Sequence, residues 1–383
     1  MDDAGQDELI DIDAAALAEV ARPGFVAGLE LAGELYSEVV EPLLSRRMPG
    51  LAYGAALIGE GSEVLGFDTP VSTDHHWGPR LQLFLRKEDL ERHANAIDEL
   101  LRNELPRELH GFSTSFGPPD EIGVRLLVSK ETGPVDHMVV VTTLSDFASG
   151  RLGFDPLEGL TLKDWLVTPQ QRLLELTAGR VFRDDDGTLA TMRETLAFYP
   201  EPLWLYTMAA QWQRISDVDP FVGRTGVVGN DTGSRVIAAA LVRNLMRLAF
   251  LQEKRYAPYE KWLGSAFARL ECARRLGPVL GRVLGAYDWT QREGHLGEAY
   301  RIVATLHNNL GVTDPLETEP SSFHGRPYKV IHGDRFAKAL HDRIDHPAVQ
   351  GLPRGLGAID QVTTHVAVLE HHERCRALAS LWN

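Results

Sequence analysis

A short part of the chain carries residue types at a spacing that could hold a phosphorylated ligand. The apolar run LAYGAALIG is followed closely by Gly61 and Ser62, and Asp74 precedes the alternating segment RLQLFLRK, which is predicted to be the next strand. A glycine lets backbone N–H groups approach a triphosphate, and a serine adds a hydroxyl donor. A carboxylate on the neighbouring strand can hold Mg²⁺ between phosphate oxygens, and the metal charge stabilises phosphoryl transfer. The pattern predicts a nucleotide site.

A purely structural alternative stays open at this point. A Gly-Ser pair and an isolated Asp-x-His are both common by chance, so neither identifies a function by itself. Gly61 and Ser62 can form an ordinary turn at the end of a strand, and Asp68 and Asp74 can be solvated acids in a loop. Only the joint placement of the glycine turn and the acid favours the nucleotide interpretation.

The resemblance to a known family extends beyond this turn. The chain resembles a bacterial family of unknown function within the polymerase-β-like nucleotidyltransferase superfamily, whose pattern reads Gly-Ser, then Gly-aromatic-Asp, then Ser-x-Asp-His-Asp-Trp-Gly-Pro-Arg. Further similarity covers LTAGRVFRDDDG from Leu176, RYAPYEKWLGSAF from Arg255 and, more weakly, GLGAIDQV from Gly355, so it spans about residues 25–370. The residues that match the main pattern are Gly61, Ser62, Gly66, Phe67, Asp68, Ser72, Asp74, His75, Trp77, Gly78, Pro79 and Arg80.

One position departs from this pattern, because His76 stands where the family has a second aspartate. The resemblance implies that Asp74 and the residue at 76 hold a divalent metal, Mg²⁺ or Mn²⁺. Imidazole suits Mn²⁺, Zn²⁺ or Fe²⁺ better than Mg²⁺, so His76 either alters the metal preference or marks a chain that has lost catalysis. The third acid of the superfamily comes from a later strand. Asp136 is the candidate for this catalytic role, and the cap of a hairpin is an equal alternative for it.

Candidates for nucleotide binding lie both near the turn and far from it. Arg80 ends the WGPR element and can point toward the same phosphates as Gly61 and Ser62. Tyr259 and Lys261 can stack a base or sugar and reach a phosphate, although the aromatic residues of this segment can instead be core. Another pair, Arg243 and Arg247, lies one turn apart on a predicted helix, and for Arg243 we favour simple solvation.

The elements expected to position these residues alternate between helices and strands. A helix is predicted over residues 25–44, strands from Leu51 and Arg80, and a helix over residues 87–105. Two further runs, from Glu121 and Pro134, predict an antiparallel hairpin, which gives a mixed sheet of about four strands.

After about residue 160 the apolar spacing becomes helical throughout. The fold class is therefore α+β, with a small mixed sheet followed by a larger all-α region. The expected division is a flexible acidic leader over 1–22, a nucleotidyltransferase-like domain over 23–158 and a helical substrate-binding domain over 159–383.

Composition excludes several classes of protein. The 383 residues include 54 acidic and 39 basic ones, and the resulting net charge of -15 argues against nucleic acid as the main partner. The two cysteines, Cys272 and Cys375, are too far apart to suggest a disulfide framework or a zinc ribbon. Neither a signal peptide nor a long apolar run is present, so we expect a cytoplasmic protein that does not enter a membrane.

Taken with the resemblance, these patterns predict a metal-dependent nucleotidyltransferase. It would move a nucleoside monophosphate from a nucleoside triphosphate such as ATP to a hydroxyl or amine of a small molecule. The alternative is a catalytically silent module that binds or senses a nucleotide and has lost one metal ligand at His76.

Overall fold

The structure is a computed structural model that describes residues 24–73, 75–121 and 123–383. The leader predicted over residues 1–22 and the candidate metal ligand Asp74 lie outside these described residues. The chain divides into two compact units. The first takes the residues up to Leu144 together with Ala178–Ala190, and the second takes Ser145–Thr177 and Thr191–Asn383. This division differs from the single boundary expected at residue 158, because the chain returns once to the first unit.

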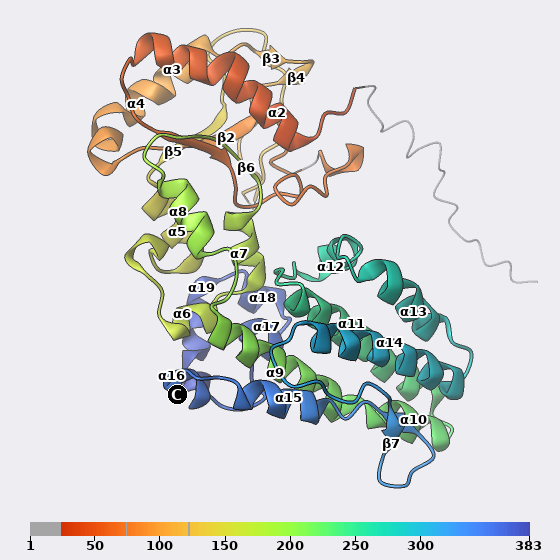
Figure 1. Ribbon diagram of the computed structural model, residues 1–383. Helices are drawn as coiled ribbons and strands as arrows, with labels where there is room; N and C mark the ends of the chain where they lie inside the picture. Colours follow the sequence, from red (N-terminus) through yellow and green to blue (C-terminus); the bar gives the residue numbers. More distant parts are fainter. Residues whose placement is uncertain (1–23, 74, 122) are drawn as a thin grey trace, which may run out of the picture. The chain divides into compact units, whose positions relative to one another are not determined.

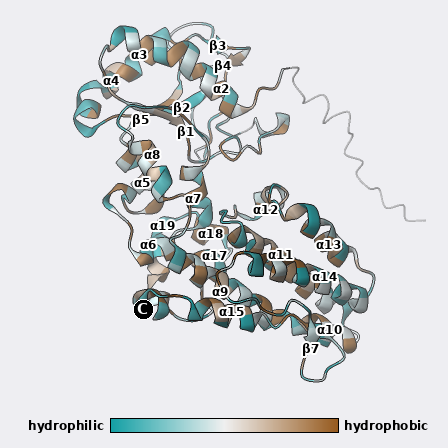
Figure 2. Cartoon of the chain, viewed as in Figure 1, coloured by the Kyte–Doolittle hydropathy of each residue, from teal (hydrophilic) through white to brown (hydrophobic). Residues whose placement is uncertain are grey.

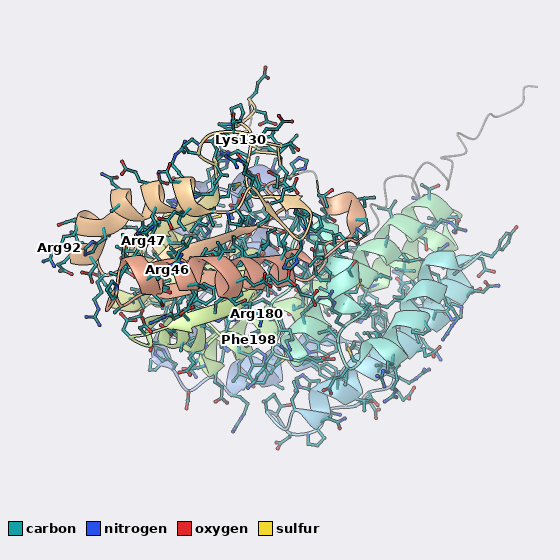
Figure 3. The ribbon with its side chains drawn as sticks, turned by 90° about the horizontal axis from the view of Figure 1, so that it is seen from above. Arg46, Arg47, Arg92, Lys130, Arg180 and Phe198 are labelled. Carbon is teal, nitrogen blue, oxygen red and sulfur yellow. The ribbon has the colours of Figure 1, made fainter. Side chains whose placement is uncertain are left out.

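The first unit starts with the helix predicted over residues 25–44. It runs as α2 (Gly28–Glu34), a π-helical segment η1 (Leu35–Val40) and α3 (Glu41–Arg47) without a break between them. Arg46 and Arg47 end α3 (Figure 3), where positive charge interacts favourably with the helix C-terminus. The side chains that face the core recur at helical spacing and include Leu31, Leu35, Val40 and Leu44.

A four-stranded mixed sheet lies within the first unit (Figure 1), as the sequence predicts. Its strands are β1 (Gly54–Leu57), β2 (Arg80–Phe84), β5 (Met138–Thr142) and β6 (Arg180–Asp184), in the order β5-β2-β1-β6. Strand β1 runs antiparallel to β2 and β6, whereas β2 and β5 run parallel. Because parallel strands need a crossover connection, the predicted helix α4 (Lys87–Glu104) lies between β2 and β5 in the chain.

Strands β1 and β2 are buried along their whole length. The continuous apolar run at β1 agrees with this burial, whereas the alternating segment at β2 also buries its polar residues Arg80 and Gln82. Helix α4 places Ile97 and Leu101, both fully buried, in the same core as Leu81 and Leu83 of β2. Figure 2 shows apolar residues concentrated in these strands and on one side of the helices. The sheet edge described below therefore belongs to a well-packed unit.

Among the described residues, the two runs predicted to form a hairpin, from Glu121 and from Pro134, do not pair with each other, so this prediction is wrong. Residues 123–129 lie instead along residues 113–117, where Gly117 N donates to Leu126 O at 2.8 Å. Strand β5 pairs with β2 in parallel and not with residues 123–129. The alternating pattern correctly marks extended chain, but the strand partners come from elsewhere in the sequence. A small hairpin precedes this region, with strands β3 (Glu108–Leu109) and β4 (Phe112–Ser113).

The second unit is mainly helical, as the sequence predicts. Helices α5 and α8 begin in residues assigned to the first unit and continue into the second. Among the described residues, no helix combines the length and apolar character needed to cross a membrane. The helices are α5 (Leu144–Leu152), α6 (Leu162–Val167), α7 (Gln170–Thr177), α8 (Thr188–Thr195), α9 (Glu201–Val218), α10 (Pro220–Val227), α11 (Asp231–Gln252), α12 (Glu260–Phe267), α13 (Ala273–Gly285), α14 (Trp289–Asn309), α15 (Gly333–Asp342), α16 (Pro347–Gln350), α17 (Ile359–Val362), α18 (Val366–Leu369) and α19 (His372–Ala377). Short elements complete the two units, namely the 3₁₀ turns η2 (Pro70–Ser72), η3 (Pro156–Glu158) and η4 (Leu378–Trp382) and the strands β7 (Ser321–Ser322) and β8 (Lys329–Val330).

Helix α9 is buried along most of its length and packs against α11 and α15. Its Trp212 is fully buried and stacks on Phe336 with ring centroids 4.2 Å apart, while His307 meets both rings edge-on. Full burial of one large apolar side chain contributes about 1.5–3 kcal/mol, so this aromatic group is a substantial part of the core.

A buried carboxyl connects three elements at the C-terminal end of α9. Asp219 is 4% exposed, and it accepts hydrogen bonds from Tyr300 Oη at 2.6 Å and from Ile331 N at 2.8 Å. Burial raises the pKa of Asp219 to about 7, although both donors act in the opposite direction. Asp219 therefore titrates near neutral pH inside the helical unit.

Candidate functional site

The glycine turn predicted to hold phosphate directly follows β1. Gly61 has φ +135°, a conformation that side-chain-bearing residues rarely adopt. A Cβ atom at this position would lie 2.5 Å from Arg80 Nη2 and 2.5 Å from Glu63 Oε2. Glycine is thus required here by the neighbouring side chains, whether or not a phosphate binds. Ser62 follows at a half-buried position, and its carbonyl accepts from Phe67 N at 2.8 Å.

Arg80 is held by a buried ion pair. Arg80 is 8% exposed and Glu63 is 2% exposed. Arg80 Nε donates to Glu63 Oε1 at 2.9 Å, and Nη2 donates to the same oxygen and to the carbonyl of Glu60 at 2.5 Å. The guanidinium predicted to bind phosphate is thus already paired. Its hydrogen bonds to Glu63 and Glu60 connect the start of β2 to the glycine turn.

His76 lies at a bend just before β2, with φ +51°. Its backbone N–H donates to the carbonyl of Arg125 at 3.1 Å, and its Nδ1 accepts from Arg125 N at 3.4 Å. Burial lowers the pKa of the His76 imidazole, and the positive charge of Arg80 lowers it further. The imidazole is therefore neutral at pH 7, which is the form that can coordinate a metal.

Asp136 lies two residues ahead of β5. Its carboxylate contacts Lys130 Nζ at 2.7 Å and Arg102 Nη2 at 2.8 Å, and the hydrogen bond from Lys130 is the main reason why its pKa is lowered. Lys130 lies in the segment that leads to β5 (Figure 3). Asp136 caps no hairpin, because none forms here. It is a half-exposed, ionised carboxylate with a cation on each oxygen.

These segments converge on one edge of the sheet. Arg80 pairs with Met138 across the parallel strands β2 and β5, so the residues preceding both strands lie on the same side. Arg125 links them, because its backbone pairs with His76 while its Nη2 donates to the carbonyl of Asp136 at 3.3 Å. The antiparallel pairing of β1 and β2 brings the glycine turn to this edge as well.

Other residues of the family-like pattern have structural roles. Asp68 Oδ2 accepts from Trp77 Nε1 at 3.1 Å and from Gly28 N, in the first turn of α2, at 2.7 Å. Trp77 is 2% exposed and packs against Phe25 and Phe112. Asp68 is therefore more than the solvated loop acid of the structural alternative, because it holds a helix start and a core indole together.

A group of three or more His, Cys, Asp or Glu side chains that could hold a metal is not found among the described residues. His76 is described, whereas its predicted co-ligand Asp74 is not.

Two residues of this edge were not predicted from the sequence. Glu63 pairs with Arg80, and Arg125 contacts both His76 and Asp136. The signal for Glu63 was its position directly after Gly-Ser, opposite an arginine at the start of the next strand.

Tyr259 and Lys261 belong to the second unit, whereas the glycine turn belongs to the first. Tyr259 is half-buried before α12, and its N–H donates to Gln171 Oε1 at 3.1 Å. Lys261 is exposed, and its Nζ lies 4.9 Å from the centre of the Trp262 ring.

A second polar constellation in the helical unit was not predicted. The buried Asp360 accepts from Gln170 N at 2.9 Å, and Gln170 Oε1 in turn accepts from Ala257 N at 2.8 Å. The next residue, Gln361, accepts at its carbonyl from Arg214. These contacts unite GLGAIDQV and RYAPYEKWLGSAF, two segments that carry the family resemblance. The resemblance to the family marked both segments, but nothing in the sequence indicated that both contact Gln170.

Comparison with known proteins gives two findings. Residues 165–263 match the family model of a domain of unknown function (DUF4037), and this segment includes Tyr259 and Lys261. A similar solved structure is that of a nucleotidyltransferase-like protein from Exiguobacterium sibiricum, with 11% sequence identity and a TM-score of 0.30, covering 77% of this chain and 82% of that chain. No curated protein matches the chain.

Proposed function

We propose that this protein is a metal-dependent nucleotidyltransferase that acts on a small molecule. The observation that carries the proposal is the convergence, at one sheet edge, of the glycine turn, the residues before β2 and the residues before β5. This edge brings together backbone N–H groups, a neutral imidazole and an ionised carboxylate. Such groups suit the polyphosphate of a nucleotide and an accompanying cation.

In this proposal Gly61 and Ser62 bind the phosphates of a nucleoside triphosphate. Asp74 and His76 hold Mg²⁺ or Mn²⁺, and Asp136 supplies the third acid. An acceptor hydroxyl or amine attacks the α-phosphorus and forms the new bond, its proton passes to solvent water, and the bond to pyrophosphate breaks so that pyrophosphate leaves. A bound metal would supply positive charge for the phosphates. For Tyr259 and Lys261 of the helical unit, the role in nucleotide binding stays a prediction.

The described residues fit this metal only in part. The neutral imidazole of His76 suits coordination, but both carboxylate oxygens of Asp136 are occupied by Arg102 and Lys130. Arg80 is likewise paired with Glu63 and must give up that contact to reach a phosphate.

These same contacts favour a second candidate, a silent module that binds a nucleotide without turning it over. In such a module the ion pair of Arg80 with Glu63 and the ion pairs of Asp136 stay intact. Only the glycine turn and Arg125 would then contact the ligand. The substitution His76→Asp separates the two functions, because it restores the family pattern. Gain of turnover supports the silent module, and loss of turnover supports a working histidine site.

The test begins with calorimetric titration of the full chain with each of the four nucleoside triphosphates, with Mg²⁺ or Mn²⁺ and after chelation. Binding is expected to require the metal and to be weakened by Asp74→Asn. The matched control is Asp89→Asn, a partly exposed acid on α4. Pyrophosphate release with candidate acceptors then distinguishes an enzyme from a silent module. If no triphosphate binds under any of these conditions, both candidates are refuted.

A further inference from the structure

Three arginines gather in the helical unit where α9 and α11 pack together. Arg214 lies on α9, and Arg243 and Arg247 lie one turn apart on α11. Gln211 Nε2 donates to Asn244 O at 3.0 Å, so the two helices touch at this level. Burial lowers the pKa of Arg214, and the charges of Arg243 and Arg247 lower it further. We call these three residues the arginine cluster.

Three acids lie near the arginine cluster. Glu260 Oε1, at the start of α12, lies 3.2 Å from Arg247 Nη2 and 3.7 Å from Arg243 Nη1. Asp217 acts on Arg214 as a nearby negative charge, and its Oδ1 accepts from Gln213 Nε2 at 2.7 Å. Burial raises the pKa of Asp360, although the charge of Arg247 opposes this shift. Glu260 is the carboxylate that contacts two members of the cluster.

Arg247 is incompletely satisfied. It is 8% exposed, and its Nε has no hydrogen-bond partner among the described residues. Leaving a buried donor unpaired is unfavourable, and an arginine presents its donors in a fixed fork that matches oxyanions. Solvent reaches the cluster from the other side, because the side chains of Arg243 and Glu260 are 37% and 43% exposed. An oxyanion can therefore approach from solvent and replace Glu260.

We propose that the arginine cluster binds the phosphate group of a small molecule, and that Glu260 occupies this site until the ligand arrives. A phosphate monoester carries up to two negative charges, and its oxygens can accept from more than one guanidinium. The further claim that this phosphate belongs to the acceptor rests on the proposed nucleotidyltransferase function. The claim that the cluster binds a phosphate group does not depend on that function.

The experiment titrates the full chain with inorganic phosphate and with glycerol 3-phosphate at low ionic strength. Arg243→Gln is expected to weaken binding about tenfold or more, as the loss of a charge-assisted contact implies. Arg247→Gln should act in the same direction. Glu260→Gln should tighten binding several-fold, because it removes the competing carboxylate. The matched control is Arg224→Gln, an exposed arginine on α10 of the same unit, which should leave the affinity unchanged.

The outcomes separate this site from the nucleotide site. Circular dichroism establishes that each variant is folded, and Arg243, being partly exposed, is the safer substitution. Equal affinities for the wild type, Arg243→Gln and Glu260→Gln overturn the proposal, as does the absence of phosphate binding. Triphosphate binding is measured on the same variants. If Arg243→Gln weakens triphosphate and phosphate alike, the acceptor role is overturned. Arginine-dependent phosphate binding without any triphosphate binding supports the cluster while the proposed function fails.

Discussion

The buried carboxyl of Asp219 makes the stability of the helical unit depend on pH. Its pKa rises from 3.8 to about 7 in the folded protein, so the folded state binds more protons than the unfolded state between these values. The resulting stability is fully present below about pH 4 and is lost as the pH rises to 7. A shift of about 3 units corresponds to roughly 4 kcal/mol of unfolding free energy.

The substitution Asp219→Asn tests this reasoning. Asparagine resembles the protonated acid, because its oxygen can accept from Ile331 N while its amide group donates to Tyr300 Oη. The variant should therefore gain stability relative to the wild type as the pH rises from 4 to 7. Glu293, the other nearby acid, and the buried His307 titrate in both proteins, so their contributions largely cancel in the comparison.

Hydrogen exchange of peptides from α9 and α14 is the suitable assay, because the two units can unfold separately. Each pH point compares the variant with the wild type, which removes the intrinsic effect of pH on exchange. The difference in opening free energy should grow by up to about 4 kcal/mol between pH 4 and 7. A difference that stays constant over this range would refute the assignment.

Two further predictions concern the first unit, and both are measured by hydrogen exchange of peptides from β1 and β2. Glu63→Gln leaves Arg80 buried without its counter-charge and should cost about 3–5 kcal/mol, whereas Glu104→Gln, which breaks the exposed pair with Arg47, should cost at most about 1 kcal/mol. Gly61→Ala places a methyl group against Arg80 and Glu63 and should cost more than about 2 kcal/mol. Gly111 also has positive φ but has open space around it, so Gly111→Ala should cost only about 1 kcal/mol. Equal effects within either pair would contradict these contacts.

Local pattern was sufficient for some elements and insufficient for others. Strands β1 and β2 and helix α4 were predictable, because their apolar runs and periodicity are properties of a few consecutive residues. The hairpin prediction failed because the pairing of β5 with β2 is decided by residues far apart in the chain. The same is true of β6, which was read as part of the helical region.

Some features of the candidate site could likewise be predicted from the sequence, and others could not. The sequence predicted that Arg80 points toward the same phosphates as Gly61 and Ser62; in the structure Arg80 donates to the carbonyl of Glu60, next to Gly61, and its role toward a phosphate stays a prediction. The pairing of Arg80 with Glu63 could not be foreseen, because an acid in a turn usually faces water. Burial of Arg247 was equally hidden, since an arginine on an amphipathic helix most often lies in solvent. Whether a charged side chain is buried depends on which elements of the fold pack around it.

The return of the chain to add β6 has a consequence for how the protein is made. During synthesis β1 emerges long before β6, so one side of β1 has no backbone partner until residue 184 is complete. An open strand edge invites pairing with other chains. A fragment that stops at residue 158 would keep this edge permanently, so the sheet needs the later segment in order to close.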